Sequence, residues 1–125
     1  MADPLIYVGT HAIKDGMLET AEQASRELVE FVEANHPRMI HFEIYIDEDA
    51  REMTVVQVHP DDDSMLLHVQ LAGDRIKAAY EFLDATTNIE IYGTPGEQLV
   101  SLIDQMRMGS PVRVNTAVAG FSRLG

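Results

Sequence analysis

Residues able to do acid–base or hydrogen-bonding chemistry alternate with aliphatic residues along several segments of this sequence. Segment 41–46 is the clearest case, because His41, Glu43 and Tyr45 would project from one side of an extended chain while three apolar side chains project from the other. The polar members of the whole set are Tyr7, His11, His41, Glu43, Tyr45, Gln57, His59, Glu90 and Tyr92. The pattern predicts a sheet with one chemically equipped face.

The histidines of this set admit two interpretations. His11, His41 and His59, with a carboxylate from Glu43 or Glu90, have the composition of a nonheme iron or zinc site. The alternative is that these polar side chains only form hydrogen bonds across the strands. No pair of them shows a short ligand spacing in the sequence, so we expect no metal site and no cofactor.

The tyrosines and glutamates of the set suit a different chemistry. Tyr7, Tyr45 and Tyr92 would form an amphipathic wall that holds a flat aromatic ligand and donates hydrogen bonds to its oxygens. Glu43 or Glu90 would act as a general base if it were desolvated. The sequence has no Gly-x-Ser-x-Gly elbow and no glycine-rich phosphate loop, which argues against a hydrolase or a nucleotide-binding protein.

The composition narrows the classes of partner. The chain has 125 residues, of which 46% are hydrophobic, and this suits one globular domain. A formal net charge of -12 argues against binding to nucleic acid or to an anionic membrane surface. Cysteine is absent, and the sequence shows neither a signal-peptide pattern nor an apolar run of about 18 residues. We therefore predict a cytoplasmic protein without disulfides or membrane spans.

The elements that must position these residues can be read from the hydrophobic spacing. Helical spacing predicts a helix that starts after Gly16 and ends at His36, before proline. A short helix from Asp61 is expected to break at Gly73, where a second helix follows. Strands are predicted at residues 5–13, 39–47, 52–59 and 88–92.

The last part of the chain, 94–125, is expected to extend the same single domain, 1–125. Thr94 and Glu97 have the spacing of a capping box and predict the start of a C-terminal helix. Residues 112–121 alternate weakly and carry little charge. We expect this tail to pair as an edge strand or to dock on a partner subunit.

The predicted order is strand, helix, strand, strand, helix, strand. This is the split βαβ arrangement of an α+β, ferredoxin-like domain, an antiparallel sheet with helices on one face. Its aliphatic face and its His and Tyr face cannot both be exposed to solvent. Either the helices cover the aliphatic face, or a second subunit does and the polar face lies under the helices. Periodicity alone does not choose between the two.

Segment 57–68 carries a family resemblance. Gln57-Val58-His59, three acidic residues and the helical His68 resemble the third strand and following helix of the antibiotic biosynthesis monooxygenase-like (ABM) family. The element order over residues 5–92 agrees with that family. The resemblance implies a dimeric α/β barrel, in which two sheets pack face to face. The aliphatic face would then close a homodimer, and all nine polar residues given above would point toward the helices and line a pocket in each subunit.

The resemblance also implies an activity. The family includes cofactor-independent monooxygenases that oxidise aromatic polyketides. It also includes heme-degrading enzymes that use an Asn on strand one, a Trp on strand three and a helical His. Here only His68 matches, since His11 (or Thr10, if the register shifts by one) and His59 occupy the other two places.

We therefore expect oxygenation of a small aromatic or polyketide-like substrate without a cofactor. His11, His59 and His68 would be catalytic, and the other polar residues would bind the substrate. Two alternatives remain. One is a noncatalytic ligand-binding or assembly module of the same fold, and the other is a metal- or heme-dependent relative.

Overall fold

The structure is a computed structural model that describes residues 4–123. Its elements follow one another along the chain as β1 (Leu5–Ile13), α1 (Leu18–Asn35), β2 (His41–Asp47), β3 (Glu52–His59), α2 (Asp62–Ala78), η1 (Ala79–Glu81), β4 (Leu83–Tyr92), α3 (Glu97–Met106) and β5 (Val112–Asn115). None of the helices in the described part of the chain is long and apolar enough to cross a membrane.

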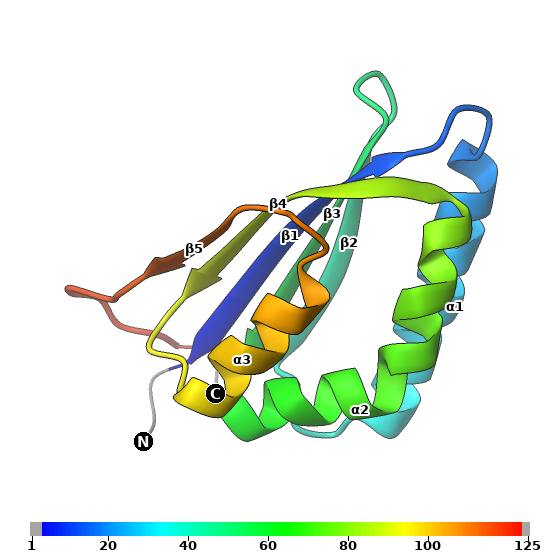
Figure 1. Ribbon diagram of the computed structural model, residues 1–125. Coiled ribbons are helices and arrows are strands. Elements are labelled where there is room, and N and C mark those ends of the chain that lie inside the picture. Colours follow the sequence, from blue (N-terminus) through cyan, green and yellow to red (C-terminus); the bar gives the residue numbers. More distant parts are fainter. Residues whose placement is uncertain (1–3, 124–125) are drawn as a thin grey trace.

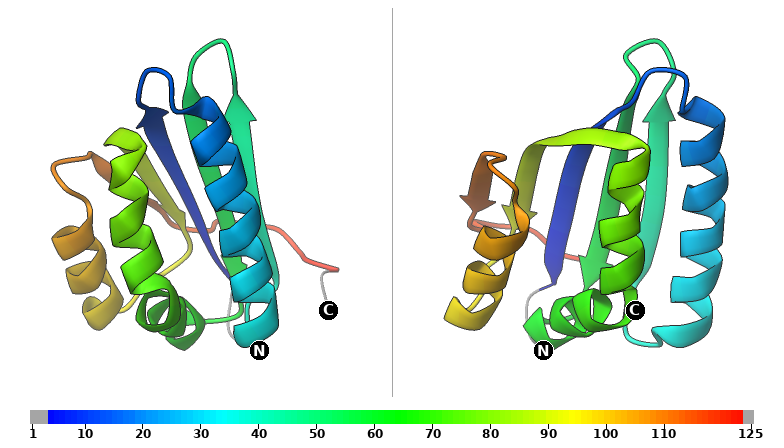
Figure 2. Two further views of the ribbon diagram at one scale, coloured as in Figure 1. Left: turned by 90° about the vertical axis from the view of Figure 1, so that its right-hand side faces the viewer. Right: turned by 45° about the vertical axis from the view of Figure 1, so that its right-hand side comes forward.

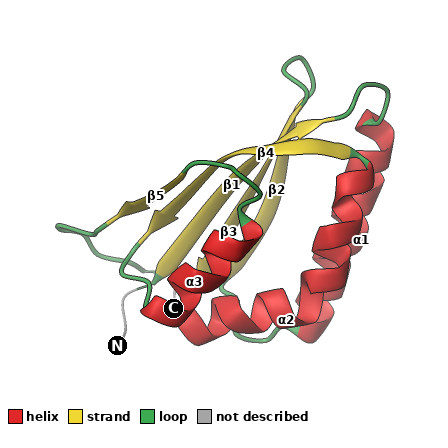
Figure 3. Cartoon of the chain, in the orientation of Figure 1, coloured by secondary structure: helices red, strands yellow, loops and turns green. Residues whose placement is uncertain are grey.

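The strands form one sheet in the order β2-β3-β1-β4-β5. All neighbouring pairs are antiparallel except β4 and β5, which are parallel. The helices α1, α2 and α3 lie on one side of this sheet, as Figures 1 and 3 show. The predicted α+β, ferredoxin-like architecture with helices on one face is therefore confirmed.

The two faces of the sheet do not divide as the sequence suggested. Residues paired across antiparallel strands share a face, and Gln57 of β3 pairs with both Tyr7 of β1 and Phe42 of β2. Tyr7 in turn pairs with Ile91 of β4. At this level of the sheet, the face under the helices therefore takes polar residues from β1 and β3 but apolar residues from β2 and β4.

This register corrects five of the nine predicted orientations. The side chains that lie on the face away from the helices are His41, Glu43, Tyr45, Glu90 and Tyr92. The alternation of side chains within each strand was predicted correctly. Which residues of two neighbouring strands share a face of the sheet depends on how the strands pair, and the sequence did not give this register. The open face accordingly mixes these polar residues with aliphatic ones such as Ile6, Val8 and Val56.

Two apolar clusters hold the helices on the sheet. One gathers around Ile91 and Leu99, which are fully buried between β4 and α3. The other gathers around Ala21 of α1 and Leu83 at the start of β4. Arg75 of α2 also stacks on the ring of Phe31 of α1, with the guanidinium carbon 4.2 Å from the ring centroid.

Helix α2 differs from its prediction at Gly73. The helix continues through this residue to Ala78 instead of breaking, and Figure 1 shows that it bends partway along its length. Glycine inside a helix costs conformational entropy but permits such a bend. The predicted boundary at Gly73 is therefore wrong, because residues 62–78 form one helix.

Two further boundaries also differ. Strand β4 begins at Leu83, five residues before its predicted start. The expected capping box at Thr94 does not form, since Gly96 is the N-cap of α3 and receives no side-chain cap from its own helix. Instead, the Gly96 N–H donates to Oδ2 of Asp62 at the start of α2, over 2.6 Å. The two helix starts are thereby tied together.

The predicted edge strand of the C-terminal tail is confirmed as β5, which pairs with β4. Figure 2 shows the rest of the tail running along the side of the sheet that faces away from the helices. Val118 and Phe121 in this tail are 97% and 81% exposed. Two large apolar side chains are thus left in solvent beside the open face.

Candidate functional site

A cavity of about 100 Å³ is lined by residues of the sheet and of the three helices. Its walls are mostly apolar, and the polar side chains among them gather at two separate places. The lining residues are Tyr7, His11, Leu28, Phe42, Met53, Val55, Gln57, Met65, His68, Val69, Ile76, Ala79, Tyr80, Leu83, Thr86, Ile89, Ile103 and Met106. An apolar chamber with a few polar groups is the usual form of a small-molecule site.

Gly9 in the middle of β1 makes room for this arrangement. A Cβ atom built on Gly9 would lie 2.8 Å from the hydroxyl oxygen of Tyr7 and 2.9 Å from its Cε1. The ring of Tyr7 therefore lies directly over the glycine. A glycine inside a strand often marks such a close approach. Gly9 inside the predicted strand 5–13 was a sequence signal for this close approach, but it was not among the predicted site residues.

The first polar group in the cavity wall is a chain of hydrogen bonds that runs inward from α2. The Ser64 hydroxyl lies 2.7 Å from Nδ1 of His59, and Nε2 of His59 lies 2.9 Å from Oε1 of Gln57. The Gln57 amide nitrogen then lies 3.3 Å from Nε2 of His68. Ser64 and His59 are fully buried and do not line the cavity, whereas Gln57 and His68 do.

His68 ends this chain with one nitrogen unpaired. Its side chain is only 2% exposed, and its Nδ1 has no hydrogen-bond partner among the residues that the structure describes. A buried polar group without a partner costs free energy. The His68 ring borders the cavity, so this nitrogen is a candidate hydrogen-bonding point for a ligand that displaces the atoms now covering it.

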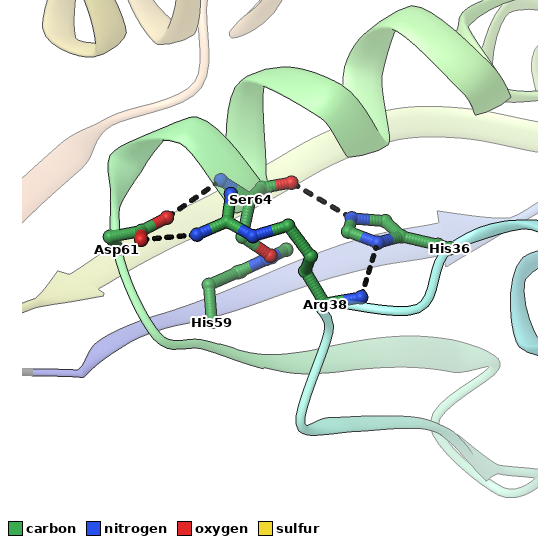
Figure 4. A network of polar contacts seen from close by, with 5 residues as sticks. All are labelled: His36, Arg38, His59, Asp61 and Ser64. Carbon is green, nitrogen blue, oxygen red and sulfur yellow. Dashed lines mark hydrogen bonds and ion pairs between the residues drawn. The ribbon is translucent and has the colours of Figure 1, made fainter.

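The position of Ser64 is fixed from outside the cavity, as Figure 4 shows. Asp61 is the N-cap of α2, and its Oδ1 accepts the Ser64 N–H at 3.0 Å. The Arg38 guanidinium forms an ion pair with the same carboxylate. His36 donates from Nε2 to the Ser64 carbonyl at 2.9 Å, while its Nδ1 accepts the Arg38 N–H at 3.4 Å. Ser64 is therefore held through three of its polar atoms.

The second polar group in the cavity wall joins three side chains. Nδ1 of His11 lies 3.0 Å from Oγ1 of Thr86, which lies 2.7 Å from the Tyr80 hydroxyl. A register shift between β1 and β4 brings Thr86 opposite His11 and under the helices. His11 lies four residues beyond Tyr7 on β1, about 13 Å along an extended strand. Tyr7 pairs with Gln57, which belongs to the first polar group. The two polar groups therefore lie at opposite ends of the cavity.

Burial keeps the cavity imidazoles neutral. Desolvation lowers the pKa of His11 and of His68 to about 4 each, and the neighbouring His36 adds to the effect at His68. Burial also raises the pKa of Tyr7, with a further contribution from Tyr80. At neutral pH the cavity therefore contains uncharged imidazoles and phenols, which can exchange protons or hydrogen bonds with a ligand but carry no net charge.

The structure brings together only part of the predicted site. Tyr7, His11, Gln57 and His68 line the cavity, His59 supports it from behind, and the five residues on the open sheet face lie outside it. The predicted site residues did not include Tyr80, Thr86, Ser64 or His36. Thr86 fell outside the predicted bounds of its strand. Ser64 was read only as part of a helix start.

The geometry does not favour the metal and heme alternatives. His11, His41 and His59 do not meet, because His41 lies on the opposite face. Within residues 4–123, no three His, Cys, Asp or Glu residues are placed to hold one metal ion. His36, His59 and His68 do cluster, with ring centroids 6.0 to 6.2 Å apart, but His59 has both ring nitrogens hydrogen-bonded.

Heme does not fit the residues present either. A cavity of about 100 Å³ lies below the roughly 300 Å³ at which ordinary small-molecule pockets begin, so it has no room for the large heme ring. Nε2 of His68, the nitrogen opposite the unpaired one, is also occupied by the Gln57 amide. An axial ligand would have to give up this hydrogen bond or bind through Nδ1.

The sequence matches no family model and no curated protein. The structure, in contrast, is similar to several solved structures. MupZ from Pseudomonas fluorescens superposes with a TM-score of 0.79 at 17% identity, covering 98% of this chain and 91% of MupZ.

Two further structures are provisionally named antibiotic biosynthesis monooxygenases. The protein from Chloroflexus aurantiacus J-10-fl has a TM-score of 0.60 at 12% identity and covers 75% of this chain and 95% of its own. The protein from Caulobacter crescentus CB15 has a TM-score of 0.64 at 16% identity and covers 72% of this chain and 88% of its own. This chain therefore has the fold of the antibiotic biosynthesis monooxygenase proteins.

Proposed function

We propose that this protein binds a small aromatic or polyketide-like molecule in the cavity and oxygenates it without a cofactor. The observation that carries the proposal is the cavity itself, an apolar chamber with uncharged polar groups at both ends. The fold, shared with proteins named as monooxygenases, supports the same reaction class. Fold alone would not suffice, because one fold hosts many functions.

The chemistry requires a proton acceptor and groups that stabilise an anion. An activated CH₂ group conjugated to a phenol reacts as CH₂ + O₂ → C=O + H₂O, so the substrate supplies all the electrons. Loss of the phenol proton activates the substrate, and His11 and His68 are the imidazoles that face the cavity. Tyr7 and Tyr80 supply hydroxyl groups that can hold the phenolate oxygen. His59, a sequence-predicted base, acts in this proposal only through Gln57.

The proposal includes a homodimer built through the open sheet face. Ile6, Val8 and Val56 lie half-buried on that face, on strands β1 and β3 at the middle of the sheet. An aliphatic surface of this kind is normally covered in soluble proteins. A second copy packed sheet to sheet would cover it and leave each cavity on the far side of its own sheet.

Oxygen uptake tests this function. Purified protein is mixed with small phenols that carry a conjugated CH₂ group, and dissolved oxygen is followed with an electrode. We expect uptake above the buffer rate, and we expect His11→Ala and His68→Ala to lower it at least tenfold, since each removes a group that faces the substrate. His41→Ala is the matched control, because it removes an imidazole from the opposite face. Equal rates with and without protein would contradict the proposal.

A second function has one specific observation in its favour. The cavity of about 100 Å³ is smaller than the roughly 300 Å³ typical of small-molecule sites, as expected if the protein only binds a small ligand or serves in assembly. Binding of small phenols, detected by NMR shifts of the cavity residues, without oxygen uptake would favour this noncatalytic function over the oxygenase.

A further inference from the structure

The hydrogen-bond chain that ends at His68 has a direction, and Gln57 sets it. An amide group has one oxygen that only accepts and one nitrogen that only donates. Oε1 of Gln57 faces Nε2 of His59, so that nitrogen of His59 must carry the proton. Nδ1 of the neutral His59 then accepts a hydrogen bond from the Ser64 hydroxyl group. The first two links of the chain are thus consistent with one another.

The amide nitrogen of Gln57 fixes the tautomer of His68 in the same way. This nitrogen donates, so Nε2 of His68 must accept. A neutral imidazole that accepts at one nitrogen carries its proton on the other. The proton of His68 therefore lies on Nδ1, the buried atom that has no partner among the described residues.

We propose that Gln57 holds His68 as an Nδ1–H donor at the cavity wall, so that the cavity selects ligands with an acceptor oxygen, a carbonyl or a phenolate. The choice of an aromatic ligand rests on the proposed function, whereas the tautomer rests on the hydrogen bonds alone. Gln57 is a positioning residue in this scheme.

This assignment separates the roles of the two cavity imidazoles. His68 stabilises oxygen at one end by donating a hydrogen bond, and it cannot also be the base while Gln57 occupies its Nε2. His11, at the other end beside Thr86, is then the proton acceptor of the proposed reaction. A donor with no competing protein partner discriminates strongly between ligands that do and do not accept a hydrogen bond.

The first experiment measures the tautomer directly in the protein without ligand. Long-range ¹H–¹⁵N correlation spectra of the imidazole rings distinguish Nδ1–H from Nε2–H forms. We expect His68 at pH 7 to be the Nδ1–H form. His36 serves as an internal control, because it has the opposite tautomer. It donates from Nε2 to the Ser64 carbonyl and accepts at Nδ1. An Nε2–H signal for His68 in the wild-type protein would overturn the proposal.

Gln57→Met gives the second readout. Methionine keeps the volume of the side chain but cannot donate to His68. We expect the His68 signals to shift toward the Nε2–H form while those of His36 stay unchanged. A loss of fold alone would disturb both residues. An unchanged Nδ1–H form of His68 in a folded Gln57→Met protein would show that Gln57 does not set the tautomer.

Ligand selection is tested with two probes of the same shape. Acetophenone has a carbonyl where α-methylstyrene has a C=CH₂ group, and the Kd of each is measured by NMR titration. One added hydrogen bond predicts about tenfold tighter binding of acetophenone to the wild-type protein. We expect this preference to fall to about twofold or less in Gln57→Met. Equal affinity of the two probes for the wild-type protein would contradict the donor role.

The outcomes also separate this inference from the proposed function. Acetophenone binding with the expected preference, but without oxygen uptake on any phenol, would reject the oxygenase and leave the donor role intact. If neither probe binds, the selection of aromatic carbonyl ligands is refuted together with the proposed aromatic site.

Discussion

His59, which is buried behind the cavity, makes folding sensitive to acid. Burial lowers the pKa of His59 to about 3, with smaller contributions from His68 and His36, against about 6.5 in an unfolded chain. The folded state therefore keeps this imidazole neutral while the unfolded state binds a proton. The stability contribution is fully present above about pH 6.5 and is lost as the pH falls toward 3.

The corresponding prediction concerns His59→Asn. Between pH 6.5 and pH 5, we expect the wild-type protein to lose about 1–2 kcal/mol of unfolding free energy through His59 alone. The variant should show a pH slope smaller by about one proton, measured by urea denaturation at several pH values. The other titrating groups are present in both proteins, so the difference in slope reports on the His59 imidazole and the groups coupled to it. Identical slopes would mean that His59 is protonated in the folded protein.

Gly9 offers a second prediction at the scale of one residue. A methyl group at this position would displace the ring of Tyr7, so Gly9→Ala should cost about 1–3 kcal/mol of unfolding free energy. Gly73→Ala is the matched control. Its Cβ would meet nothing within 4 Å inside helix α2, and it should stabilise the protein by about 0.5–1 kcal/mol. Chemical denaturation gives both values. A neutral Gly9→Ala would show that Tyr7 moves freely.

At the scale of elements, the sequence predicted which residues alternate but not how neighbouring strands align. Side-chain alternation within β2 was read correctly from residues 41–46. Whether His41 or Phe42 faces the helices depends on which of them pairs with Gln57, and this register is a long-range property. The same limitation hid Thr86, which a register shift turns under the helices.

The start of α2 is the element-scale test. Asp61 caps this helix and accepts the Ser64 N–H, and that bond, together with Arg38, lowers the pKa of the carboxyl group. We expect Asp61→Ala to cost about 1 kcal/mol of unfolding free energy, as loss of an N-cap typically does. It should also perturb the NMR signals of His59, which contacts Ser64. Asp49→Ala, in the exposed hairpin turn, should do neither.

At the scale of the whole molecule, the fold was predictable because the order of strands and helices leaves few topologies open. The segment from Gln57 to His68 also pointed to the correct fold family, although no sequence match supports it. The site was predictable only in part. Tyr7, Gln57 and His68 lie on elements whose place in the fold follows from this order. Tyr80 was expected on the helix predicted after Gly73, and it lies in the short helix η1, where its contact with Thr86 could not be foreseen.

The proposed dimer is tested by Val8→Glu on the open sheet face. A buried charge in the interface should convert the dimer to a monomer, because an unpaired carboxylate cannot be desolvated cheaply. Size-exclusion chromatography with light scattering measures the mass. Val100→Glu on α3, where the valine is already 45% exposed, should leave the mass unchanged. A wild-type protein that runs as a monomer would refute the dimer.

The two halves of α2 contribute differently to the cavity wall. Ser64 and His68 precede Gly73, and they belong to the hydrogen-bond chain through Gln57. Ile76 follows Gly73 and forms part of the apolar wall. A change in the apolar wall near Ile76 would therefore alter the size of the cavity while leaving the hydrogen-bond chain in place.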